Sequence, residues 1–296
     1  MKSHVASLVA FSALVLSVSV MAQDAITKKP QGGPPPLGIH WAKGVKPASH
    51  HGKSPLMLWH NGPILTDSAV QVIYWGTSWG NSKFVGDKMS GLTSWYTGFS
   101  GSNYATTSDE YTGTNGQVGP SNTLGSDVID LSPAGSGAKT STILAEVCKR
   151  ITSPVANGYY PVYVDLPRGH AGYCAYHSWG SCGSTPVQFA FFWNLDGDPG
   201  CDPQDTSKLH SQGLGALANV SGHELSEART DPTGAGWFDS SGAENGDKCA
   251  WTFNVPLVTF SNRSQWKIQG EWSNAAYNAG TGYPNSSGQH GCLDGH

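Results

Sequence analysis

The segment His223-Glu224-Leu225-Ser226-Glu227 contains the residue types and the spacing of a metal centre with a neighbouring base. On a helix, His223 and Glu227 lie four residues apart and point to the same side. An imidazole and a carboxylate placed in this way can bind one divalent ion. Glu224 is offset by one residue, the position of a carboxylate that takes a proton from water in metal-assisted hydrolysis. We therefore predict that His223 and Glu227 bind metal and that Glu224 is the catalytic base.

Carboxylates that follow this segment are candidates for a third ligand. Pro232 disfavours a helical conformation at Asp231, so we expect the helix to end there and to free the Asp231 side chain for capping or metal binding. The chain then turns and presents Glu244 and Asp247 on a glycine-containing segment beside Cys249. We predict that Glu244 or Asp247 is the third ligand, and Asp231 is a further candidate.

The same pentapeptide also occurs on exposed helices, where its polar side chains form a solvated face. Gly222 and Ala228 permit close packing around this helix, and the flanking sequence is apolar, which favours a metal site. Residues 196–205 carry four carboxylates, but their spacing differs from that of an EF-hand loop, so we interpret them as a structural turn rather than a calcium site. For His170 and His177, which flank Cys174, we favour packed or solvated roles over metal binding.

A framework of strands and helices must hold the site-bearing helix, which we expect over residues 207–229. Apolar, β-branched and aromatic runs predict buried strands, and apolar residues spaced three and four apart predict helices. The expected strands are 69–75, 159–166 and 187–193, and the other expected helices are 85–96 and 141–151. Residues 98–138 are rich in Gly, Ser, Thr and Asn and should form a long loop. The fold class predicted is α+β, with a mixed sheet packed on the site-bearing helix in a single domain over 59–296.

Composition and charge exclude several classes of protein. Charged residues make up only 13% of the 296 residues, whereas the chain has 38 Gly and 11 Trp, which is typical of a loop-rich globular protein and excludes a coiled coil, a collagen and a disordered chain. Residues 1–60 hold six basic residues and one acidic residue, which leaves a net charge of −9 for 61–296. Because nucleic-acid binding needs a clustered basic face, no nucleic-acid partner is expected.

The first 58 residues have the features of an export signal followed by a linker. Residues 1–22 combine an early lysine, an apolar stretch and small residues before a cleavage position, as a secretory signal peptide does. The alternative, a membrane anchor, is disfavoured because the apolar stretch is too short to span a bilayer. Residues 23–58 are Pro-rich and predict a flexible arm, in which His40, His50 and His51 are given no role. We expect a secreted protein, extracellular or periplasmic, with no membrane attachment after cleavage.

Six cysteines in an exported chain predict three disulfides. Fifteen pairings of the six are conceivable, and the sequence does not select among them. Proximity in the sequence offers Cys174 with Cys182 and Cys249 with Cys292 as simple pairings. The absence of a CxxC pair argues against a zinc site made of thiolates.

The segments 223–232 (HELSEARTDP) and 238–251 (FDSSGAENGDKCAW) resemble a group of exported microbial proteins of mostly unproven activity. These proteins are in turn similar to the plant phosphate-induced, exordium-like family. The segments 60–66 (HNGPILT) and 72–76 (VIYWG) support that second link, and Gly172-Tyr173-Cys174 leading to Cys182-Gly183 fits it more loosely. The resemblance covers about residues 59–251 and implies an association with growth and the cell wall, although the plant proteins lack the His-Glu helix.

The helix is also similar to that of zinc metallopeptidases with the HExxH motif, except that Glu227 stands where those enzymes have a second histidine. This resemblance implies a zincin-like fold, bound zinc, and hydrolysis of peptide bonds in a protein or peptide substrate. A carboxylate ligand adds negative charge and should make a bound water less acidic, so calcium or a purely structural ion is the alternative.

Two functions from different classes therefore follow from the sequence. The first is a secreted, zinc-dependent peptidase. The second is a non-enzymatic extracellular or cell-wall protein of exordium-like type, with a structural metal or with a glycan-binding surface built from Trp79, Trp179 or Trp237.

Overall fold

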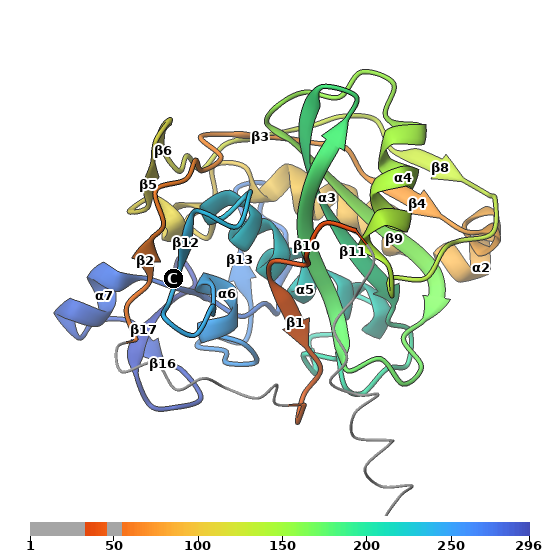
Figure 1. The fold of residues 1–296 in the computed structure, drawn as a ribbon. Helices are drawn as coiled ribbons and strands as arrows, with labels where there is room; N and C mark the ends of the chain where they lie inside the picture. The colour runs from red at the N-terminus through yellow and green to blue at the C-terminus, as the bar shows by residue number, and fades with distance from the viewer. Residues whose placement is uncertain (1–32, 46–54) are drawn as a thin grey trace, which may run out of the picture.

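A mixed sheet lies at the centre of the structure, which is a computed structural model describing residues 33–45 and 55–296 (Figure 1). The predicted signal peptide, part of the predicted arm, and His50 and His51 lie outside the described residues. The eight strands of the sheet are β1 (Ile39–Trp41), β3 (Ser68–Val70), β4 (Ile73–Trp75), β7 (Asn122–Leu124), β8 (Val128–Asp130), β9 (Gly158–Pro167), β10 (Tyr173–Cys182) and β11 (Thr185–Asn194). The helices are α2 (Ser82–Val85), α3 (Lys88–Phe99), α4 (Thr140–Arg150), α5 (Gln212–Thr230), α6 (Asn245–Lys248) and α7 (Asn274–Ala279), with the 3₁₀ turns η1 (Thr77–Gly80) and η2 (Ala105–Ser108).

The three long strands β9, β10 and β11 set the topology of the sheet. β11 runs parallel to β9 and antiparallel to β10, and β1 adds an antiparallel edge strand beside β10. On the other side of β9 lie the short parallel strands β3 and β4. Seven of the ten residues in each of β9 and β11 are buried, which is expected for strands covered on both faces.

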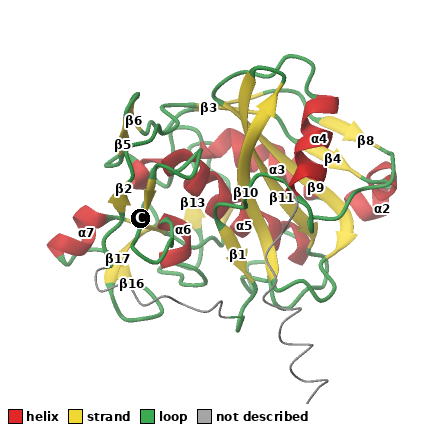
Figure 2. Cartoon of the chain, viewed as in Figure 1, coloured by secondary structure: helices red, strands yellow, loops and turns green. Residues whose placement is uncertain are grey.

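Helices cover both faces of this sheet (Figure 2). On one face, α4 packs with Leu144 against β10 at Gly180, where a Cβ would collide with the leucine side chain. On the other face lie α5 and α3, and the Ser221 hydroxyl of α5 is 2.6 Å from the Tyr163 hydroxyl of β9. Because neighbouring residues of a strand point to opposite faces, His177 of β10 points towards α5 whereas Tyr176 points towards α4.

The helix α5 is buried along its whole length after Gln212. Its first turn is capped by Ser211, whose hydroxyl accepts a hydrogen bond from the backbone N–H of Leu214 at 3.2 Å. The helix ends at Thr230, with Asp231 as its C-cap before Pro232, as predicted. It begins five residues later than the predicted start at 207, because the Asp205 carboxylate accepts from the Ser207 N–H and holds a turn there.

Several predicted elements need correction. The predicted strand 69–75 is two short strands, β3 and β4, with a break between them, and the predicted helix 85–96 is divided between α2 and α3. The predicted loop 98–138 contains η2 and the short strands β5 (Thr112–Gly113), β6 (Gly116–Gln117), β7 and β8. The strand β10 was not predicted. The predictions for α4, β9 and β11 are confirmed to within two residues.

The predicted flexible arm is wrong for part of its length. Ile39–Trp41 form β1, which is hydrogen-bonded to β10, and both Ile39 and His40 are buried. Leu58 and Trp59 form β2, which pairs with β12 (Trp237–Phe238). The sequence between residues 33 and 45 lacks periodicity because an edge strand of three residues is too short to show it.

The C-terminal segments, drawn blue in Figure 1, form a second layer beside α5. They contain the pairs β13 (Val258–Thr259) with β14 (Gln265–Trp266), and the three-stranded sheet of β15 (Glu271–Trp272), β16 (Tyr283–Pro284) and β17 (His290–Leu293). Within the described ranges, 33–45 and 55–296, no helix combines the length and the apolar character that crossing a membrane requires.

All six cysteines form disulfides, as predicted: Cys148–Cys182, Cys174–Cys201 and Cys249–Cys292. The pairing of Cys249 with Cys292 is therefore confirmed. The pairing of Cys174 with Cys182 is wrong, because these residues lie at opposite ends of β10, an extended strand of ten residues. The chain is thus a mixed α+β, sheet-rich single domain with three disulfides, which are typical of proteins in an oxidising extracellular environment.

Candidate metal centre

Three of the predicted ligands converge where α5 meets α6. His223 and Glu227, one turn apart on α5, have their Nε2 and Oε1 atoms 3.1 Å apart. Asp247 reaches the same place from α6, with its Oδ1 atom 3.7 Å from His223 Nε2. Together His223, Glu227 and Asp247 form a group whose ligand atoms all lie within 4.8 Å of one another. Of the two predicted alternatives for the third ligand, Asp247 is therefore the one that joins the helix pair.

Glu244 lies on the other side of Glu227. Its Oε2 atom is 3.2 Å from His177 Nε2, and the same imidazole nitrogen is 3.7 Å from Glu227 Oε2. His177, Glu227 and Glu244 form a second group of potential ligands, all of them buried. The two groups share Glu227, which presents one carboxylate oxygen to each.

Glu224 is fully buried and belongs to neither group of ligands. Neither of its carboxylate oxygens has a hydrogen-bond partner at normal distance among the described residues, although the backbone N–H of His40 lies close enough to lower the pKa of the group. Burial raises the pKa of Glu224 well above its usual range, and the charges of Glu227 and Asp247 raise it further. Glu224 is therefore an enclosed carboxylate that is not part of either group of potential ligands.

Asp231 is not brought into the centre. Its Oδ1 atom accepts a hydrogen bond from the backbone N–H of Gly236 at 2.7 Å, so the carboxylate closes the turn after α5.

The acidic turn 196–205 is also a structural element, as predicted. Asp196 pairs with Lys88, and Asp198 pairs with Arg168 at 2.6 Å, so these carboxylates already have protein cations as partners.

Three residues at the centre were missed by sequence reasoning. His177 comes from β10, where it was assigned a packed or solvated role, and His40 comes from β1, where it was given none. The His40 ring lies edge-on to the His223 ring, with centroids 4.1 Å apart, and both His40 nitrogens lack a partner among the described residues. Gln269, which no motif marks, places its amide nitrogen 3.1 Å from His223 Nδ1. No spacing signal links these three residues, because they come from separate strands and a loop.

The charge state of the centre follows from its burial. Burial lowers the pKa of both His177 and His223 to about 3, so both imidazoles are neutral, which is the form that binds metal. Burial also raises the pKa values of Glu227, Glu244 and Asp247 well above their usual ranges. Buried carboxylates without a cationic partner are costly, and a metal cation is the partner that would make their ionisation favourable.

The donor atoms fit a divalent transition metal. Ligands about 2.1 Å from a tetrahedral ion lie roughly 3.4 Å from one another, and the two distances from His223 Nε2, 3.1 and 3.7 Å, bracket this value. One imidazole with two carboxylates is a zinc-type set, whereas calcium prefers oxygen ligands alone. Ligation through Nε2 places the ring proton on Nδ1, where it needs an acceptor. In the structure the Gln269 amide nitrogen faces Nδ1 and donates to the Gly246 carbonyl, and the amide oxygen accepts from the Trp251 N–H, so metal binding through Nε2 requires this amide to rearrange.

Neighbouring segments enclose the centre. A Cβ on Gly38, just before β1, would overlap Glu227 Oε2, and a Cβ on Gly246 of α6 would lie 2.8 Å from His223 Nδ1. Only Asp247 has appreciable side-chain exposure, at 24%. Two surface cavities lie away from the centre, one beside Thr281 and Asp294 and the other beside His210 and Trp266.

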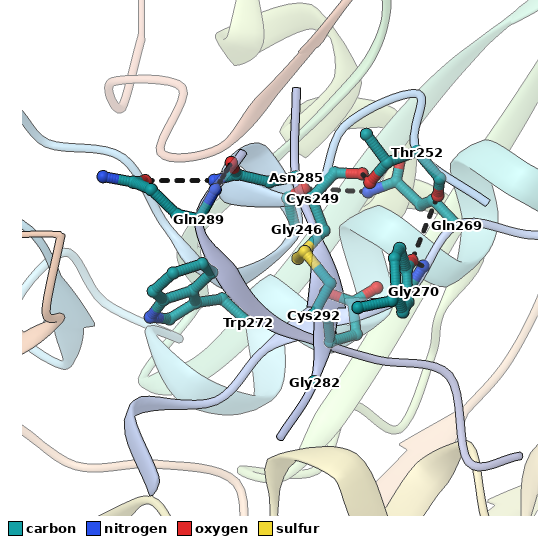
Figure 3. Close-up of a disulfide and its surroundings, with 12 residues drawn as sticks. Gly246, Cys249, Thr252, Gln269, Gly270, Trp272, Gly282, Asn285, Gln289 and Cys292 are labelled. Atoms are coloured by element: carbon teal, nitrogen blue, oxygen red, sulfur yellow. Dashed lines mark hydrogen bonds between the residues drawn. A yellow bond between two sulfur atoms is a disulfide. The ribbon is translucent and has the colours of Figure 1, made fainter. Parts of the chain in front are cut away.

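A disulfide fixes α6, the helix that carries Asp247. Figure 3 shows Cys249, at the C-terminal end of α6, bonded to Cys292 of β17. On the other side of the helix, the Gln269 amide donates to the Gly246 carbonyl at 2.8 Å. The position of Asp247 therefore depends on both a covalent bond and a buried hydrogen bond.

Replacing Cys249 and Cys292 together by Ser is expected to lower the free energy of unfolding by about 2–5 kcal/mol and to weaken metal binding. The reason is that α6 loses its covalent link to β17. Thermal unfolding and metal content after dialysis measure the two effects. The matched control is the double replacement of Cys148 and Cys182 by Ser. The disulfide between these two residues joins α4 to β10, away from the centre. A similar loss of metal in both variants would contradict the specific role of the Cys249–Cys292 bond.

No protein-family model, no curated protein and no solved structure matches this chain, so its side-chain geometry is the basis for assigning a function.

Proposed function

We propose that the chain is an exported, metal-dependent peptidase with a zincin-like arrangement, in which α5 carries the site beneath a mixed sheet. The observation that carries this proposal is the state of Glu224. Its carboxylate is buried, interacts electrostatically with Glu227 and Asp247, and has no side-chain hydrogen-bond partner among the described residues, the backbone N–H of His40 being the one polar group that lowers its pKa. A buried carboxylate with a purely structural role normally has partners. A buried carboxylate that lies near candidate metal ligands and that only a backbone N–H approaches is suited to accept a proton during a reaction.

Each residue of the centre then has a separate task. His223, Glu227 and Asp247 hold the metal, with zinc as the first choice. When bound, zinc supplies Lewis acidity that polarises a carbonyl group and makes water more acidic. Glu224 accepts the proton from the attacking water and passes it to the leaving amine. Gln269 orients the His223 ring through Nδ1.

A substrate needs a route to this enclosed centre. The segment Gly38–His40, which leads into β1, lies directly on the potential ligands, with Gly38 against Glu227 and His40 against His223. β1 is also the edge strand of the sheet, held on one side only by β10. Peptide hydrolysis in this proposal therefore requires β1 to move away from the centre.

The enclosure itself favours a second candidate function, an exported non-enzymatic protein of exordium-like type with a structural metal. In that case the ligands stabilise the junction of α5, α6 and β10. Glycan binding in this alternative has to use Trp179 or Trp237, which are partly exposed. Trp79 is buried, and its indole N–H donates to the Tyr163 carbonyl at 3.0 Å.

Metal removal separates the two candidates. For the peptidase, hydrolysis of an unfolded protein substrate should be lost on treatment with a chelator and should return with zinc. If the metal binds only the folded chain, free zinc at about 1,000 times its Kd should also raise the free energy of unfolding by about 4 kcal/mol. The measurements are substrate cleavage and thermal unfolding on one sample. A zinc-loaded protein that is stabilised but inert towards a broad peptide panel would support the non-enzymatic candidate.

A further inference from the structure

The group His177, Glu227 and Glu244 has the same make-up as the group proposed to bind zinc. Each consists of one histidine, one carboxylate from α6 or its N-cap, and one oxygen of Glu227. In the second group, His177 Nε2 lies 3.2 Å from Glu244 Oε2 and 3.7 Å from Glu227 Oε2. These separations again bracket the value of roughly 3.4 Å expected between ligands of one tetrahedral ion.

Glu227 Oε2 gives independent support for a ligand at this position. Glu227 is fully buried, and its Oε1 atom accepts a hydrogen bond from the backbone N–H of Asp247 at 3.0 Å. Its Oε2 atom faces His177 and has no hydrogen-bond partner among the described residues. An unpartnered carboxylate oxygen in the interior is rare and costly. A cation at this position would satisfy it.

The balance of charge around Glu227 points the same way. Four buried or half-buried carboxylates, Glu224, Glu227, Glu244 and Asp247, gather around this point. The nearest buried arginine, Arg229, is directed away, with its guanidinium donating to the Ala105 and Gly119 carbonyls. Lys248, the neighbouring lysine, pairs with Asp239 at 2.8 Å, so these protein cations do not partner the carboxylates at Glu227.

We infer that the chain binds a second divalent cation through His177, Glu227 and Glu244, so that Glu227 bridges two ions with its two carboxylate oxygens. A bridging carboxylate is the feature that lets two metal ions lie close together in hydrolytic centres. The inference extends the proposed function but is independent of it, because the second group lacks Asp247 and His223 and can be tested separately.

Two substitutions on α6 provide a matched test. Glu244 and Asp247 form a reciprocal capping box, in which each side chain accepts from the other residue's backbone N–H. Glu244→Gln and Asp247→Asn keep this shape and remove one metal ligand each, from different groups. His177→Asn adds a second variant of the inferred site, because asparagine is too short to place an atom at the Nε2 position. Glu244→Gln and Asp247→Asn should therefore lower the stability of the fold by similar amounts, and they should differ only in which metal site they affect.

The measurement is metal content after loading with zinc and dialysis, together with cobalt titration followed by visible absorption. We expect two ions per wild-type chain, and one in each of Glu244→Gln, His177→Asn and Asp247→Asn. Cobalt should enter the wild type in two steps and each variant in one.

The outcomes distinguish the two proposals. One ion in the wild type, retained in Glu244→Gln and His177→Asn but lost in Asp247→Asn, would overturn the second site and leave the proposed function intact. One ion in the wild type, lost in Glu244→Gln and retained in Asp247→Asn, would overturn both the bridging role of Glu227 and the proposed catalytic site, because the single ion would then lie at His177, Glu227 and Glu244. A wild type without metal would overturn both.

Discussion

Glu224→Gln is expected to lower the rate of peptide hydrolysis by about 10²–10⁴-fold while metal content and melting temperature remain close to those of the wild type. Loss of a general base commonly has an effect of this size, and glutamine has nearly the same shape as glutamate but cannot accept the proton. Metal should be retained because Glu224 belongs to neither ligand group. Initial rates on an unfolded protein substrate, compared at equal metal content, measure the effect.

Glu271→Gln is the matched control for this substitution. Glu271 is equally buried, but its Oε1 atom accepts a hydrogen bond from the Tyr104 hydroxyl at 2.7 Å, and it belongs to neither ligand group. We expect the hydrolytic activity of Glu271→Gln to stay within a few-fold of that of the wild type. Full activity in metal-loaded Glu224→Gln would remove the mechanism, and an equal loss in both variants would show a structural rather than a catalytic effect.

Glu227→Gln is expected to have the largest effect on metal binding, with an affinity at least about 100-fold weaker at both groups. Mutation of a residue that merely supports a ligand typically costs 10–100-fold, and Glu227 contributes directly to both groups. Metal content should fall towards zero after dialysis. The stabilisation that zinc gives the wild type should also disappear, so that thermal unfolding no longer depends on added zinc.

Glu146→Gln serves as the control, since Glu146 is another buried helical glutamate. It lies on α4, across the sheet from the centre, where it pairs with Lys149 at 3.1 Å. This variant should keep the metal content of the wild type even if it unfolds at a lower temperature. Retention of both ions by Glu227→Gln would disprove the bridging role and, with it, the ligand assignment for α5.

Local patterns in the sequence were sufficient to predict the helix that carries His223, Glu224 and Glu227. The positions of His223, Glu224 and Glu227 relative to one another depend only on helical periodicity, and the end of α5 depends on Pro232. Likewise, α4, β9 and β11 were predictable because their apolar patterns are long. The three disulfides followed from the number of cysteines, but only one pairing followed from proximity.

The partners of the helix were decided by the tertiary structure. His177 and His40 reach the centre because β10 and β1 pair at one edge of the sheet, and pairing between distant segments leaves no local spacing in the sequence. The choice between Glu244 and Asp247 was also open in the sequence. Both enter the centre, on opposite sides of Glu227, because α6 is a single turn that presents its N-cap and its third residue to different neighbours. The sequence alone thus determined that His223 and Glu227 lie on the same side of α5. Long-range packing determined that residues of β1, β10 and α6 lie against that side.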